Sequence, residues 1–271
     1  MKVIEGILFV FFLTLTMTGC VIKQPKSVPT IESTDSPEIN CLADLAYKDG
    51  GDKTKCKVDI EENGKPVSYL VLTDNFENSG NCLLLRENLM DKDRIYNVKG
   101  TEYLSYYATS DIDKYLNGEF LATFSSEMQK QIADSIITIV DKSSFFNAGQ
   151  VTTTILRKVF LLSYTEVNAR KQLAIPTEGK TLEYFTNDSS RIVYYKNGTR
   201  GNWWLRSPDT GDIGLIQAID KEGVTGPGGI SGFGDGPNGE YTLGVRPAFC
   251  LSGTLHINKT EDNGVVLYHI D

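Results

Sequence analysis

Few residues in this sequence have the types and spacing needed for catalysis, and most of them lie in its last third. Asp209 and Asp212 form a carboxylate pair of the kind that glycosidases use, and Asp235 follows farther along the chain. Turn formation accounts for the same residues, because aspartate favours turns. The histidines, His256 and His269, lie at the C-terminal edge, where we expect surface residues rather than catalytic or metal-binding groups.

A glycine-rich stretch over residues 226–240 carries a second candidate site. Asp235, Asn238 and Glu240 place side-chain oxygen atoms there, and oxygen ligands on a loop can hold calcium. The alternative is again turn formation. Residues 234–239 also match G-x-G-x-x-G, but a dinucleotide fingerprint needs a strand before it and a helix after it, and here a strand follows. We therefore expect no cofactor, with calcium as the one metal that the loop could hold.

The N-terminus carries a different chemistry, which is lipid attachment. Lys2 precedes the uncharged run from Ile7 to Leu15, whose length suits a signal peptide and is too short to span a bilayer. The sequence Met17-Thr18-Gly19-Cys20 then resembles the lipobox of bacterial lipoproteins. That resemblance implies cleavage after residue 19, a diacylglycerol thioether on Cys20 and a place on the outer face of the cytoplasmic membrane. An ordinary cleaved signal, with Cys20 incidental, is the alternative.

Composition divides the remaining chain. Residues 20–40 are rich in Pro, Ser, Thr, Lys and Glu without apolar periodicity, which is typical of a disordered tether. We expect an N-terminal extension over residues 41–65, a main domain over 66–258 and a tail or strand over 259–271. The net charge is −8 and no Lys/Arg cluster is present, so nucleic-acid binding is not expected.

The cysteines leave two alternatives open. If Cys20 carries lipid, an even number remains for an oxidising compartment. We favour Cys41–Cys56, which would close a short polar loop, and Cys82–Cys250, which assumes that the first and last strands of the domain are neighbours. Three pairings are possible from sequence, and buried free thiols are the other reading.

Hydrophobic patterning indicates short strands mixed with a few helices. Capping residues predict helices that begin after Ser110, near Ser126 and at Ser163, the last with a capping box to Glu166. Helices early and short strands with long glycine-rich loops late predict an α+β fold. The strand candidates are residues 67–72, 81–86, 136–140, 158–162, 203–206, 214–219 and 243–249.

Two motifs are more distinctive than the rest. They are Trp-Trp-Leu-Arg-Ser-Pro over residues 203–208 and Val-Arg-Pro-Ala over residues 245–248. In that order, the motifs resemble an uncharacterised domain family of secreted and phage-encoded bacterial proteins, from about residue 66 to 252. The resemblance implies a layout similar to C-type-lectin-like folds, with short twisted antiparallel strands and two or three helices. Formylglycine-generating enzymes share that layout, but their chemistry needs a cysteine pair near the C-terminus, where only Cys250 is present.

The first interpretation of the motif residues is a structural role. Adjacent residues on a strand face opposite sides, so Trp203 and Trp204 can pack in different places. Arg206, Arg246 and Trp204 are expected to act as clamps, since a guanidinium can tie loop carbonyls and a carboxylate together. Direct ligand contact is the alternative for the two arginines.

The first hypothesis for function is therefore a non-catalytic binding module, anchored to the membrane through lipid, for a glycan or protein ligand. An enzyme on the same fold, acting on cell-envelope or glycan substrates through Asp209, Asp212 or Asp235, is the rival, and a structural envelope protein is the third hypothesis. The candidate ligand-binding residues of the first hypothesis are Trp203, Phe233, Asp235, Asn238 and Tyr241.

Overall fold

The computed structural model describes residues 39–98, 105–147, 151–169, 176–208, 215–225, 230–231, 242–262 and 264–270. All of these residues fall within one unit, 39–271. The predicted signal peptide, Cys20, most of the predicted tether and most of the glycine-rich stretch lie outside the described residues.

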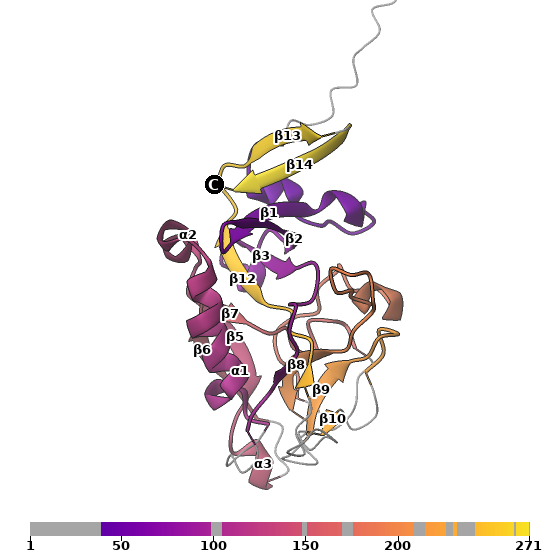
Figure 1. The fold of residues 1–271 in the computed structure, drawn as a ribbon. Coiled ribbons are helices and arrows are strands. Elements are labelled where there is room, and N and C mark those ends of the chain that lie inside the picture. Colours follow the sequence, from indigo (N-terminus) through magenta and orange to yellow (C-terminus); the bar gives the residue numbers. More distant parts are fainter. Residues whose placement is uncertain are drawn as a thin grey trace, which may run out of the picture. The chain divides into compact units, whose positions relative to one another are not determined.

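A mixed seven-stranded sheet runs in the order β13-β14-β1-β2-β3-β12-β7 (Figure 1). β1 pairs in parallel with β14, and every other neighbouring pair in this sheet is antiparallel. The strands are β1 (Lys57–Glu62), β2 (Lys65–Thr73), β3 (Asn81–Arg86), β7 (Val159–Phe160), β12 (Ala248–Ser252), β13 (Asn258–Asp262) and β14 (Val265–Ile270).

Three smaller sheets hold the remaining described strands, in the orders β10-β9-β8, β5-β6 and β11-β4. The two distinctive motifs are divided between sheets, because the first forms β8 and the second leads into β12. The strands are β4 (Arg94–Ile95), β5 (Ser135–Val140), β6 (Thr152–Arg157), β8 (Trp203–Pro208), β9 (Leu215–Ile219), β10 (Ile230–Ser231) and β11 (Thr242–Leu243).

Helices in the described residues are short. α1 (Asp111–Tyr115) continues through a π-helical segment (Leu116–Phe120) and a 3-10 turn (Leu121–Thr123). Ser110 caps α1 by accepting a hydrogen bond from Asp113 N at 3.1 Å. The others are α2 (Ser126–Gln131), α3 (Ser144–Asn147) and the 3-10 turns Leu42–Leu45, Lys53–Lys55, Phe76–Asn78, Tyr107–Thr109 and Asp188–Arg191.

The prediction of an α+β, C-type-lectin-like fold is therefore wrong, because the described chain is mostly β. The predicted strands 67–72 and 81–86 form β2 and β3, which pair in antiparallel fashion, but β1 and β6 were not expected as strands. The segment 259–271, expected as a tail or strand, contains most of β13 and all of β14. The capping box at Ser163 is the most informative error. Ser163 and Glu166 do exchange its hydrogen bonds, at 3.0 and 2.9 Å, yet the chain turns there and no helix follows. Glu166 instead enters a buried ion pair.

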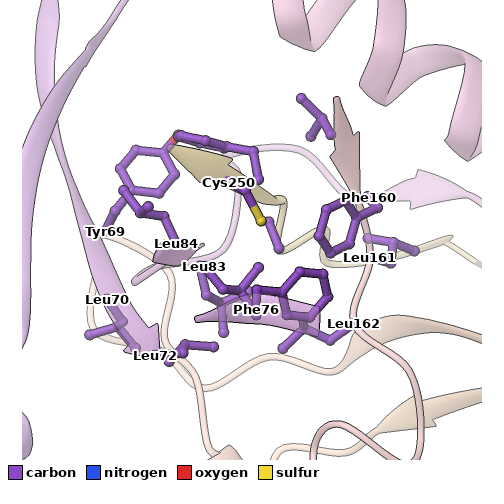
Figure 2. Close-up of a cluster of buried hydrophobic side chains, with 14 of the residues drawn as sticks. Tyr69, Leu70, Leu72, Phe76, Leu83, Leu84, Phe160, Leu161, Leu162 and Cys250 are labelled. Atoms are coloured by element: carbon purple, nitrogen blue, oxygen red, sulfur yellow. The ribbon is translucent and has the colours of Figure 1, made fainter. Parts of the chain in front are cut away.

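The core packs on the large sheet (Figure 2). Phe76 stacks on Phe160 with ring centroids 5.6 Å apart, and Leu83 and Cys250 are buried beside them. Figure 2 shows the Cys250 sulfur among carbon side chains, and burial raises the pKa of that thiol to about 12. Cys250 is thus an inert core residue in this environment.

The favoured disulfides are absent, since Cys41, Cys56, Cys82 and Cys250 are all free. The strand register explains why Cys82 and Cys250 form no disulfide. Cys82 lies opposite Leu251 and Cys250 lies opposite Leu83, so the two thiols point to opposite faces of the sheet. Cys41 and Cys56 make separate contacts, to the Asp44 carboxylate at 3.3 Å and the Asp52 carbonyl at 3.4 Å.

Candidate functional site

Four arginines among the described residues are buried, and their N–H groups must find partners inside the protein. An isolated buried charge is costly, so a buried guanidinium normally contacts a carboxylate and several carbonyl oxygens. The way in which each arginine meets this demand separates structural from functional positions. The four are Arg86, Arg191, Arg206 and Arg246, with exposed fractions of 4%, 2%, 0% and 3%.

Arg206 on β8 is fully compensated. Its Nη1 and Nη2 atoms each donate to the Glu166 carboxylate at 2.7 Å, in the paired geometry that suits a guanidinium. Nη1 also donates to Leu161 O at 2.8 Å, and Nε donates to Thr138 O at 3.0 Å. The side chain thereby ties β8 to β5, to the segment after β7 and to the turn at Ser163, which is the geometry of a structural clamp.

A second carboxylate, Glu178, is buried in the same cluster. It accepts hydrogen bonds from Val140 N at 3.1 Å and from the Ser207 hydroxyl. Burial raises the pKa of Glu178 to about 7, although Arg206 opposes the rise. Glu178 therefore changes charge near neutral pH inside the cluster that holds β8.

Both tryptophans of the first motif are completely buried. Trp204 packs edge-on against Tyr96 and donates from Nε1 to Arg94 O at 2.8 Å. Trp203 donates from Nε1 to Arg191 O at 3.1 Å. No part of the Trp203 ring is open to a ligand, so this residue, predicted from sequence as a ligand contact, lies in the core instead.

Arg246 is the exception among the buried arginines. Its Nε donates to Arg86 O at 2.8 Å, and its guanidinium carbon lies 5.3 Å from the centre of the Trp203 ring. Nη1 is buried without a hydrogen-bond partner, and in the described part of the chain no carboxylate pairs with the guanidinium. Burial lowers the pKa of Arg246 to about 10.

The other two buried arginines show what Arg246 lacks. Arg86 donates to the Glu62 carboxylate at 2.8 and 3.3 Å and to two carbonyl oxygens. Arg191 pairs with Asp188 and donates to the carbonyls of Gly223, Val167 and Asn168. Each of these arginines has an acidic partner. Arg246, without one among the described residues, therefore differs from the other buried arginines of this fold.

Arg246 lines a pocket of about 220 Å³ to which distant segments contribute. Lys53 comes from the turn before β1 and Lys57 from β1 itself, whereas Glu87 follows β3 and Tyr184 lies in the segment before residue 190. Three cations and one carboxylate therefore line the pocket, in a chain whose net charge is −8. This local surplus of positive charge suits an anion.

The ammonium groups of both pocket lysines already interact with other residues of the protein. Lys57 forms an ion pair with Glu87. Lys53 donates to Tyr184 O at 2.5 Å and to the Thr186 hydroxyl at 3.5 Å, and its ammonium lies 4.7 Å from the centre of the Tyr184 ring. The Arg246 guanidinium is thus the cation that an incoming anion can pair with most directly.

Sequence reasoning identified part of this site. It singled out Arg246 as a structural clamp, with ligand contact as the alternative, and missed Lys53, Lys57 and Tyr184. The other sequence-predicted candidates lie outside the described residues, so their predicted roles stay predictions: Asp209, Asp212, Phe233, Asp235, Asn238, Glu240 and Tyr241.

Comparison with known protein families matches residues 79–253 to a family described as Domain of unknown function (DUF6273). The match covers more than half of the 271-residue chain. The chain belongs to the DUF6273 family. Comparisons with curated proteins and with solved structures found no match.

The DUF6273 match contains both motif arginines, Glu166, Glu178 and Tyr184, whereas Lys53 and Lys57 precede it. The pocket of this DUF6273 protein is thus built jointly by the family domain and the segment before it. Within the described ranges, no cluster of His, Cys, Asp and Glu could hold a metal ion. None of the described helices is long and apolar enough to cross a membrane.

The raised pKa of Glu178 predicts a pH-dependent stability. Because the folded-state pKa of about 7 exceeds the ordinary 4.5, the contribution to stability is present at low pH and is lost as pH rises through 7. We expect the free energy of unfolding to fall by about 2 kcal/mol between about pH 5.5 and 8. Urea unfolding at both values measures it. Glu178→Gln, which mimics the protonated acid, should remove most of this difference; parallel pH profiles for the two proteins would contradict the assignment.

Proposed function

We propose that this protein is an exported, lipid-anchored binding protein, and that the pocket around Arg246 receives an anionic group of its ligand. The observation that carries the proposal is the buried guanidinium of Arg246, which has no carboxylate partner among the described residues. A ligand anion would supply the missing charge and hydrogen-bond acceptors.

The other buried arginines support a ligand-binding role for Arg246. Three buried arginines have acid partners within the protein, which is the arrangement expected for stability alone. Leaving Arg246 unpaired lowers the stability of the unliganded fold, and such a cost is typical of functional positions. The ion-paired state of Glu87, the pocket's carboxylate, favours binding over acid–base catalysis.

The anchor rests on the sequence from Lys2 to Cys20. A lipid on Cys20, followed by a tether to about residue 40, would hold the pocket outside the cytoplasmic membrane. There it would meet extracytoplasmic ligands, either glycan or protein.

Anion binding is tested by thermal unfolding at constant ionic strength with sulfate, phosphate and acetate as probes. An anion at about ten times its dissociation constant stabilises by about 1.4 kcal/mol, which corresponds to a rise in midpoint of roughly 3–6 °C. We expect at least one probe to give a saturable rise that disappears in Arg246→Gln.

Lys130→Gln is the matched control, because it removes one positive charge from an exposed position on α2. It should keep the full anion response. Equal responses of the wild-type protein and Arg246→Gln to every probe would overturn the proposed function.

Lipidation is tested by expressing the full chain in bacteria fed with radiolabelled palmitate. Label should enter the wild-type chain and be lost in Cys20→Ser, because the thioether requires the thiol. Cys41→Ser, which changes the partly exposed cysteine of the domain, should retain it. Undiminished labelling of Cys20→Ser would refute the anchor.

A further inference from the structure

The chemistry of the pocket narrows the class of anion. Nε of Arg246 is engaged with Arg86 O, whereas Nη1 and Nη2 make no hydrogen bond to any described residue. The edge of the guanidinium that carries these two nitrogen atoms is therefore without a hydrogen-bond partner among the described residues, although Nη1 itself is buried. Two parallel N–H groups on that edge match the two oxygen atoms of a carboxylate, and they also match two oxygen atoms of a phosphate.

Charge distinguishes the two anions. Lys57 is neutralised by Glu87, and Lys53 donates hydrogen bonds to Tyr184 and Thr186. Arg246 is therefore the pocket cation that remains available to pair with an anion. Glu87 lines the same pocket and is close enough to Arg246 to raise its pKa. A single carboxylate balances the one unpaired guanidinium, whereas a doubly charged phosphate would leave one negative charge uncompensated.

The size of the pocket limits what enters it. Its volume of about 220 Å³ is below the roughly 300–1,000 Å³ of sites that enclose whole drug-sized ligands. The pocket therefore accepts an end group rather than an entire molecule. Leu70, Ile192 and Val193 add apolar wall, which favours an end group with a small apolar part over a fully hydroxylated sugar.

Asn88 supplies the remaining recognition element. Asn88 lines the pocket, its backbone oxygen accepts from Arg86, and its side-chain amide makes no hydrogen bond to any described residue. A side-chain amide donates and accepts at once, as a peptide group does, so Asn88 can pair with an amide of the ligand. The C-terminal residue of a peptide combines these features, since it carries one carboxylate, one amide and a side chain that can be small and apolar.

Resting on the proposed function, we infer that the Arg246 pocket binds the C-terminal amino-acid residue of a peptide, with its carboxylate on Arg246, its amide at Asn88 and a small apolar side chain against Leu70, Ile192 and Val193. Capture of a terminal carboxylate is an established mode of peptide recognition.

The test titrates the full-length protein with N-acetylalanine, as both enantiomers, and follows binding by NMR. N-acetylalaninamide is the matched neutral probe, and inorganic phosphate and glucuronic acid represent the other anion classes. We expect one N-acetylalanine enantiomer to bind most tightly of all probes, and the neutral amide to bind about 10- to 100-fold more weakly, the range for a charge-assisted hydrogen bond.

Variants locate the contacts. Arg246→Gln should weaken N-acetylalanine binding about 10- to 100-fold and Asn88→Ala about 3- to 10-fold, whereas Lys130→Gln should leave it unchanged. Circular dichroism and thermal unfolding establish that each variant is folded, and Asn88→Ala tests the site independently if Arg246→Gln is not.

The outcomes separate this inference from the proposed function. Tighter, Arg246-dependent binding of phosphate or glucuronic acid would overturn the peptide assignment and leave an anion-binding function in place. Equal binding of N-acetylalanine and its neutral amide would also overturn the assignment. An absence of Arg246-dependent binding for every anion would overturn both.

Discussion

The free-energy cost of removing a guanidinium from water determines which partners surround the buried arginines of this structure. Arg206 shows how the fold meets that cost: its pairing with Glu166 and its bonds to Leu161 and Thr138 hold β8 against β5 and the segment after β7. The ion pair lies where both partners are almost fully buried, so neither can be removed without leaving a buried charge. This ion pair therefore anchors the small sheet that carries the first motif, together with the hydrogen bonds of Trp203, Trp204 and Ser207.

For Arg246, the desolvation cost of the guanidinium is only partly offset by contacts within the protein. Trp203, buried beneath it, presents a ring to the guanidinium, and Arg86 O accepts from Nε, but no described carboxylate balances the charge. The aromatic ring and the carbonyl fix the position of the cation without neutralising it. This combination of rigid placement and incomplete pairing is what a preorganised binding group requires, because the ligand completes the site and no rearrangement need precede binding.

Sequence reasoning predicted the same clamp role for Arg206 and Arg246, with ligand contact as the alternative, and could not distinguish the two residues. Only contacts between residues that are distant in sequence show that Arg206 pairs with Glu166 and that Arg246 pairs with no acid in the described part of the chain. The Ser163 capping box formed without a helix, since the chain turns over residues 164–168 and Glu166 pairs with Arg206. The α+β prediction failed partly because β1 lies in a segment that was expected to be an extension outside the main domain, whereas β1 pairs with both β14 and β2 in the large sheet. Lys53 and Lys57 were missed because a polar surface segment gives no signal of the pocket it borders.

The central claim is that Arg206 stabilises the fold whereas Arg246 is kept for a ligand. Urea unfolding of Arg206→Met and Arg246→Met, without added anions, tests it most directly. The account predicts that Arg206→Met loses about 3–5 kcal/mol, because Glu166 is left as an unpaired buried charge. Arg246→Met should change the free energy of unfolding by less than about 1 kcal/mol, since an uncompensated charge is removed together with one hydrogen bond. A loss in Arg246→Met as large as that in Arg206→Met would contradict the account.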